Sequence, residues 1–331
     1  MIRMRTIPYL FSLTTVSFTT FSLSAIAQAE VNPINSRFSS PIESLFNLPG
    51  MSETHLLDSG QTKARVKVEV VSNAVTMDNA PEVVRFDGET WRLTPSWSMG
   101  FDNGWQASAE LPIVRHSSGF LDNSIDKFHE VFNFREGSRD DFPRNELVYG
   151  YQNGSDLDYI IQGSENGIGD LRLQLSKSFT DSPFIVHLHL KAPTGDEDKL
   201  MGSGSWDAGA SVSYLKTQIF EIDTLSFAAE LGQHYLGDAE QIRNQKKHVT
   251  TLHTGIFWEA IPDVILKGQL ESHSKLSESN LEPVESEALQ LTLGLTLYTA
   301  SSHQWDIAIS EDLKTDSTAD VTFFVEWTSL Y

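Results

Sequence analysis

Apolar residues alternate with polar or small residues along many segments of this chain. The clearest example has leucine at every second position from Leu289 to Leu297, with glutamine, threonine or glycine between them. Successive side chains of a β-strand point to opposite faces of a sheet, so this period of two predicts a strand with one apolar face. Segments 64–70, 171–175, 184–191, 264–271 and 305–309 repeat the pattern. The chain is therefore expected to be an all-β protein.

The strand lengths and the rhythm of the connections favour a membrane barrel over a soluble sandwich. Many segments can run for about nine to thirteen residues, close to the length of a tilted membrane strand, whereas strands of soluble proteins are more often shorter. Short connectors alternate with long polar ones, as in outer-membrane barrels with short periplasmic turns and long outer loops. The long polar connectors are 72–88, 193–205, 237–247, 276–286 and 313–319.

The predicted fold is a transmembrane antiparallel β-barrel over residues 63–331, with 12 to 14 strands and both ends in the periplasm. The lower number applies if 145–152 and 156–162 form a hairpin outside the membrane. The other predicted strands are 63–71, 89–101, 104–114, 169–179, 184–192, 205–216, 224–236, 248–259, 264–275, 287–299, 304–312 and 320–331.

The N-terminus has the layout of an export signal. Arg3 and Arg5 precede an apolar stretch over 7–23, and Ala27-Gln28-Ala29 supplies small residues where a signal peptidase cleaves. We predict a signal peptide over 1–29 and a mature protein in the outer membrane of a Gram-negative bacterium. Loss of two arginines changes the formal charge from 24 − 45 = −21 to 22 − 45 = −23, which argues against nucleic acid as a partner.

Two segments fall outside the strand series. Residues 30–62 contain three prolines and no clean period, so we expect them to cross the periplasmic mouth or enter the lumen. Residues 120–134 have apolar residues spaced four, three and four apart, which predicts one short helix in an outer loop. No run of eighteen apolar residues occurs, which excludes a helix-bundle membrane protein. The absence of cysteine excludes disulfides and thiolate chemistry.

Aromatic residues gather near the expected strand ends. Trp105, Trp258, Trp305 and Trp327 lie near periplasmic ends, and only Trp97 falls in mid-strand. Indole prefers the membrane interface because its ring is apolar and its N–H needs a partner. The last strand ends the chain on an aromatic residue, which is similar to the terminal signal that the barrel-assembly machinery recognises. The residues assigned to this signal are Phe323, Val325, Trp327 and Tyr331.

Charged residues at alternate strand positions are expected to face the lumen. A lysine or arginine on the lipid face costs about 2–4 kcal/mol at mid-membrane, so these side chains must point inward. The candidate lumen-lining residues are Arg172, His187, His189, Lys191, His253, Lys267, Glu271 and His273. Further inward positions include Arg65, Lys67, Glu69, Arg92 and Glu110. The outer surface would meet membrane lipid and lipopolysaccharide.

Several short motifs resemble an outer-membrane family known as domain of unknown function 3187. They are Asn32-Pro33, Leu48-Pro49-Gly50, the stretch Phe86–Arg92, His116–Asp122 with Ile125–His129, Gly167–Asp170, Lys191–Asp196, Gly202-Ser203-Gly204 and Asp207. The resemblance covers roughly residues 32–331. It implies an outer-membrane barrel and no particular activity, so it assigns no functional residue.

Two chemical hypotheses were weighed against simpler ones. His116-Ser117-Ser118-Gly119 faintly resembles a stretch of outer-membrane phospholipase, but no residue can be named to orient the histidine, and a strand-to-loop transition explains it. Asp122, Asp126 and His129 share one face of the predicted helix, where a solvated surface is commoner than a metal site. We therefore assign no catalytic residue, no metal site and no cofactor, and we do not expect an enzyme.

Three functions remain open at this point. The first is a passive channel, or a binding site, for a small solute that the sequence does not name. The second is a structural or surface-interaction barrel whose lumen is plugged by residues 30–62. The third is an outer-membrane lipid hydrolase.

Overall fold

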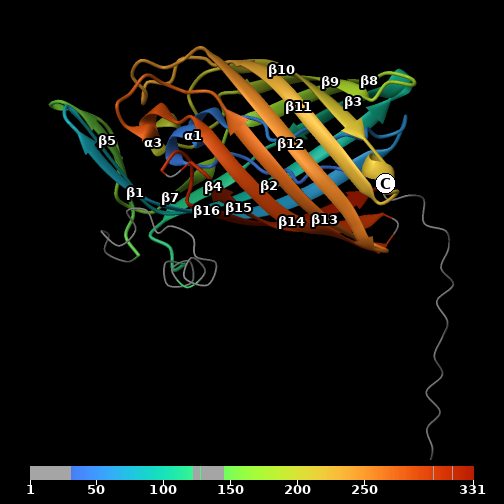
Figure 1. Cartoon of the computed structure of the whole chain (residues 1–331). Coiled ribbons are helices and arrows are strands. Elements are labelled where there is room, and N and C mark those ends of the chain that lie inside the picture. Colours follow the sequence, from blue (N-terminus) through green and yellow to red (C-terminus); the bar gives the residue numbers. More distant parts are fainter. Residues whose placement is uncertain (1–30, 122–126, 128–144, 301, 315) are drawn as a thin grey trace, which may run out of the picture.

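The computed structural model describes residues 31–121, 127, 145–300, 302–314 and 316–331. Figure 1 shows a barrel of long tilted strands. One end, here called the loop end, carries the long connectors and the short helices α1 (Pro41–Phe46) and α3 (Glu282–Glu285). The other, the termini end, carries the C-terminus. The predicted signal peptide and most of the predicted helix 120–134 lie outside the described residues.

Twelve antiparallel strands close the barrel, which confirms the predicted fold. β1 (Thr62–Asn79) pairs with both β16 (Val321–Leu330) and β2 (Glu82–Phe101), so the first and last strands meet. The ring continues through β3 (Trp105–Glu110), β4 (Ile113–Ser117), β7 (Glu165–Ile168), β8 (Leu171–Ser178), β9 (Phe184–Ala192), β10 (Asp207–Lys216), β11 (Leu225–Tyr235), β12 (His248–Ile261), β13 (Val264–His273), β14 (Ala288–Ala300) and β15 (His303–Asp312).

Two of the twelve strands are interrupted. β3 and β4 follow one another along β2 and are separated at Leu111-Pro112. β8 and β7 lie beside them in the same way and are separated at Gly169-Asp170. Proline has no N–H to donate to a sheet, so the first break follows from the sequence. The second break leaves Asp170 between β7 and β8, where its carboxylate pairs with Lys191 of β9 at 3.1 Å.

A four-stranded sheet projects beyond the loop end. β5 (Val148–Asn153) pairs with the outer part of β2, and β6 (Asp156–Ile161) pairs with β5 (Figure 1). The hairpin of 145–152 and 156–162 thus lies outside the ring, which gives twelve barrel strands. The prediction of a long polar loop over 72–88 is wrong, because these residues form the paired ends of β1 and β2. Their apolar side chains, Val75 and Phe86 among them, pack in a buried cluster that the sequence pattern does not reveal.

The barrel wall is apolar outside and polar inside. Exposed side chains such as Val66, Leu252 and Leu293 alternate with buried ones such as Lys67 and Glu271. A soluble protein has the opposite arrangement, because burial of a charged group costs free energy unless it is paired. Among the described residues, no helix is long and apolar enough to cross a membrane.

The aromatic girdle at the termini end includes one residue that the sequence placed elsewhere. The Trp97 ring stacks on the ring of Tyr331, with 6.5 Å between centroids. Trp97 lies opposite Ala64, two residues into β1. It is therefore close to the termini end, and its assignment to mid-strand is wrong.

The terminal strand presents Val325 and Tyr331 on the exposed face, and Trp327 stacks on His303 with 5.9 Å between ring centroids. We expect Trp327→Asp, and deletion of Tyr331, to lower the yield of folded barrel severalfold, because a charge is unfavourable on the lipid face and the terminal aromatic is lost. The measurement is the heat-modifiable band in outer-membrane fractions. Asp198→Asn, on an exposed loop, is the control. Normal yield from both terminal variants would contradict the assigned assembly signal.

Candidate functional site: the filled lumen

Residues 31–61 run through the inside of the barrel and back. Val31 and Met51 pack with Phe257 and Ile265 in one apolar cluster. α1, at the far point of the path, packs in a second cluster with side chains of the loop end. The chain then returns to begin β1 at Thr62. We call residues 31–61 the lumen segment, with an ascending arm before α1 and a returning arm after it.

α1 is a single short helix with clear start and stop signals. Ser40 and Glu43 form a capping box, and Pro41 occupies the first turn. Asn47 ends the helix in a left-handed conformation, with φ 47°. The helix buries Ile42, Leu45 and Phe46 against the loop end. The local sequence thus places an apolar tip on the lumen segment.

Glu43 also fixes α1 to the barrel. One carboxylate oxygen of Glu43 lies 3.0 Å from His273 Nε2 and accepts from Ser286 Oγ at 3.2 Å. The other accepts from Thr318 Oγ1. These partners come from β13 and from two loops at the loop end, so the helix is held on several sides.

Lys191 joins α1 to the wall and to one of the long loops. Its ammonium donates to Leu45 O at 2.9 Å and to Ser203 Oγ at 2.5 Å. It pairs with Asp170 at 3.1 Å and with Asp207 at 2.7 Å. Four separate motifs of the family resemblance therefore meet at one ammonium group. Their role in the described structure is to anchor loop 193–205 and α1 together.

The ascending arm is bound to the wall by polar contacts. Ser36 Oγ donates to Glu271 at 2.6 Å, and the Ile34 N–H donates to Gln269 Oε1 at 2.5 Å. Lys67 Nζ donates to the Asn35 carbonyl at 2.6 Å. The wall residues come from β13 and β1.

Arginines cluster where the arm passes β2, β3 and β8. Arg37 of the lumen segment pairs with Glu110 of the wall, and Arg172 lies 3.7 Å from the other oxygen of Glu110. Nearby, Glu69 pairs with Lys67 at 3.0 Å and with Arg92 at 3.6 Å. Each of these buried charges thus has an opposite charge within reach, as burial requires.

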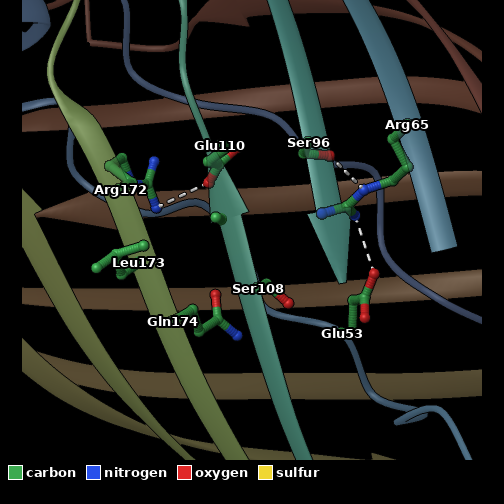
Figure 2. A pocket seen from close by; sticks show the side chains of 9 residues that line it. Glu53, Arg65, Ser96, Ser108, Glu110, Arg172, Leu173 and Gln174 are labelled. Carbon is green, nitrogen blue, oxygen red and sulfur yellow. Dashed lines mark hydrogen bonds and ion pairs between the residues drawn. The ribbon is translucent and has the colours of Figure 1, made fainter. Parts of the chain in front are cut away.

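The returning arm is bound through Glu53 near the termini end. The Glu53 carboxylate forms ion pairs with the Lys63 ammonium at 2.5 Å and the Arg65 guanidinium at 2.9 Å. It also accepts a hydrogen bond from Gln106 Nε2 at 2.8 Å. Figure 2 shows Arg65 between Ser96 and Glu53, and Arg172 facing Glu110. These side chains line a cavity of about 30 Å³, which is room for one or two water molecules.

Histidines line the lumen on β9, which is next to β8, and on β12. His187 lies between Ser176 and Ser213, with nitrogen-to-oxygen distances of 2.8 and 2.9 Å. His189 Nε2 lies 3.0 Å from Ser211 Oγ. The His253 Nδ1 is 3.6 Å from Glu271.

The eight candidate lumen-lining residues all lie inside the barrel. Seven are buried, and His189 is partly buried. Lys267, the one not yet placed, pairs with Asp306 at 3.0 Å. Lys191, Glu271 and His273 contact the lumen segment directly. Arg172, His189 and Lys191 line one cavity together with residues 46–49 of that segment.

Sequence reasoning missed the partners on the lumen segment. Arg37, Glu43 and Glu53 carry the main ion pairs of the segment, and nothing in their spacing indicates this. Asp170 appeared only as part of a motif. The one sequence feature that could have indicated these partners is that residues 30–62 carry charged side chains, show no strand or helix periodicity, and directly precede the first barrel strand.

Among the described residues, His116 does not pair with Ser117, the neighbouring serine. His116 is buried, with Nδ1 2.8 Å from Thr90 Oγ1. Ser117 is the next residue of β4, so its side chain points to the other face of the strand. No group of three potential metal ligands occurs among the described residues. All three residues considered as metal ligands on the predicted helix, Asp122, Asp126 and His129, lie outside the described residues.

The closed ring, the apolar exterior and the polar interior define an outer-membrane β-barrel. More specifically, the chain belongs to the family described as Protein of unknown function (DUF3187), which matches residues 9–329. No curated protein matches the chain.

Solved structures with a similar fold are outer-membrane channels. The outer-membrane channel from Pseudomonas putida F1 has a TM-score of 0.55 at 11% identity, over 85% of this chain and 99% of that chain. The NanC porin gives 0.44 at 11% identity, over 82% and 99%. The CymD monoaromatic hydrocarbon channel gives 0.43 at 10% identity, over 83% and 89%. The similarity to the first of these structures shows a shared fold.

Proposed function

We propose that this protein is an outer-membrane channel for a small polar solute, closed by its lumen segment in the state described here. The observation that carries the proposal is the chemistry of the wall behind the segment. Charged side chains line the lumen over much of its length: Lys67 and Glu271 are buried, and the partly buried Arg65 and Glu110 line an interior cavity. If the segment withdraws, water wets this surface and the lumen stays open.

The nature of the contacts supports the same function. Along most of its path the segment is held by ion pairs and hydrogen bonds, which water replaces at modest net cost in free energy. Replacing buried ion pairs by apolar residues is often neutral or stabilising. A segment that only had to fill the barrel permanently would have no need of so many charges.

A structural barrel is the second candidate, and one observation favours it. α1 packs into a buried apolar cluster at the loop end, together with Val84, Leu200, Leu236 and Leu281. An apolar tip resists withdrawal, because its exposure costs about 25 cal/mol for each Å². The two functions therefore differ in whether α1 leaves this cluster.

The test is planar-bilayer recording of the whole chain and of a variant that lacks residues 34–57. We expect the shortened variant to give a steady conductance many times larger than that of the whole chain. Heat-modifiability confirms that each protein is folded. A folded shortened variant with no current above background would discard the channel in favour of the structural barrel.

Labelling of a unique cysteine gives a second measurement on the whole chain. The protein has no cysteine, so Ser36→Cys introduces one thiol, at a buried site. If the segment withdraws, a membrane-impermeant thiol reagent will label this residue slowly, at the rate of opening. Ser118→Cys, on an exposed loop, is the control for full reactivity. Complete protection of Ser36→Cys over hours would contradict a withdrawing segment.

A further inference from the structure

The Glu53 carboxylate occupies a set of donors that all belong to the barrel wall. Lys63 and Arg65 come from β1 and Gln106 from β3, and they reach both carboxylate oxygens. Lys63 and Gln106 are more than nine-tenths buried, and the Glu53 side chain is 12% exposed. Two cations and an amide donor thus surround one carboxylate, as expected for a site that recognises this group.

A third wall cation lies beside these donors. Arg172 is 8% exposed, and its Nη1 has no hydrogen-bond partner among the described residues. Arg172, Arg65 and Glu53 line the same cavity of about 30 Å³ (Figure 2). A buried guanidinium nitrogen without an acceptor is costly, so this cavity favours an acceptor atom.

Withdrawal of the lumen segment changes the balance of charge here. Glu53 leaves Lys63 and Arg65, and Arg37 leaves Glu110. Glu110 keeps Arg172 at 3.7 Å. Among the described residues, no ion pair within 4.0 Å joins Lys63 or Arg65 to an acid of the wall. The two cations then face the lumen with no described wall carboxylate within 4.0 Å, and Arg65 keeps only more distant interactions with Glu326, Glu110 and Asp306.

We propose that Lys63, Arg65 and Gln106 form a carboxylate-binding subsite of the lumen, occupied by Glu53 in the closed state and by the carboxylate of a small solute in the open state. The inference rests on the proposed function and names its solute class. Glu53 acts in this scheme as an internal competitor. The cavity beside Arg172 accommodates a water molecule or part of the solute next to the carboxylate.

The first test is a melting experiment with acetate on the whole chain and on Glu53→Gln. Glu53→Gln removes the competing carboxylate while it keeps the shape of the side chain. We expect saturating acetate to raise the midpoint of heat-modifiability of Glu53→Gln by about 2–4 °C. Acetamide, which has the same shape without the charge, should have no effect. Acetate should also leave the wild-type midpoint unchanged relative to chloride at equal ionic strength.

Glu43→Gln is the matched control. It removes the other buried carboxylate of the lumen segment, whose partners in the described structure are two hydroxyls, the Ser40 backbone N–H and His273, with no lysine or arginine among them. We expect no acetate effect on Glu43→Gln. An equal shift in all three proteins, or no shift in Glu53→Gln, would overturn the subsite. If Glu53→Gln does not fold, the same comparison is made on the variant lacking residues 34–57, with and without Arg65→Gln.

The second test measures ion selectivity in the variant that lacks residues 34–57. Under a potassium chloride gradient, Arg65→Gln should move the reversal potential toward cation preference, and acetate should reduce the chloride current. Lys216→Gln, an exposed residue at the end of β10, should change neither. If no current is seen, the proposed channel function is wrong. The acetate-dependent shift of the melting midpoint then still tests the carboxylate-binding subsite. Current that is insensitive to acetate and to Arg65→Gln overturns the subsite alone.

Discussion

Asp170→Ala is expected to lower the midpoint of heat-modifiability by roughly 10 °C. The substitution leaves the buried Lys191 ammonium with one carboxylate in place of two. Loss of one partner of a buried ion pair typically costs about 3–5 kcal/mol, and this cost sets the expected shift. The measurement is band mobility in detergent against temperature.

Asp170 does more than balance a charge. Its carboxylate accepts the backbone N–H groups of Thr194, Gly195 and Ser203 at 3.0, 2.8 and 3.2 Å. We therefore also expect loop 193–205 of the variant to become sensitive to protease. Asp198→Ala, an exposed acid of the same loop, is the control. A variant of Asp170 that melts with the wild type would show that the loop is held by other contacts.

Gly50→Ala is expected to separate the two arms of the lumen segment. A Cβ at Gly50 would lie 1.9 Å from the carbonyl oxygen of Ser36 on the opposite arm. Overpacking of this kind costs about 1–3 kcal/mol, which raises the undocked fraction about 5- to 150-fold. In the channel proposed here, the leak conductance of the whole chain rises by a similar factor.

The control for Gly50→Ala is Gly163→Ala. A Cβ at Gly163 meets nothing within 4 Å, and its φ is not in the left-handed region. Single-channel recording of both variants, with labelling of Ser36→Cys in each background, makes the comparison. The prediction is contradicted if Gly50→Ala shows the leak conductance of the wild type and its Ser36→Cys thiol is protected as in the wild-type background. The added methyl group would then not open the lumen.

The barrel was predictable from the sequence because its physical cause is local. A membrane strand must present an apolar side chain to lipid at every second position, so the pattern from Leu289 to Leu297 carries the fold directly. The extension of β1 and β2 was missed for the same reason. Its residues 72–79 and 82–88 are not in lipid, and their apolar partners lie on β5, β6 and the loops.

The contacts of the lumen segment could not be predicted. Ser36 and Glu271 are 235 residues apart, and Ser52 and Glu230 are 178 apart. Inward orientation of Glu271 followed from its strand position, but its partner depended on the path of a segment that has no period. The site around Glu53 illustrates the limit. The inward orientation of Arg65 followed from its strand position, but nothing in the sequence indicated Glu53 as its partner.

The path of the lumen segment has a consequence for assembly. Its two arms leave the barrel at the same end, so it can enter as a doubled chain after the seam between β1 and β16 has closed. No free end has to be threaded through the ring, and no knot forms on entry or exit. The order of events is therefore not imposed by topology: a complete, empty cylinder can be built first and filled later, and it can be emptied again without undoing a single pairing of its strands.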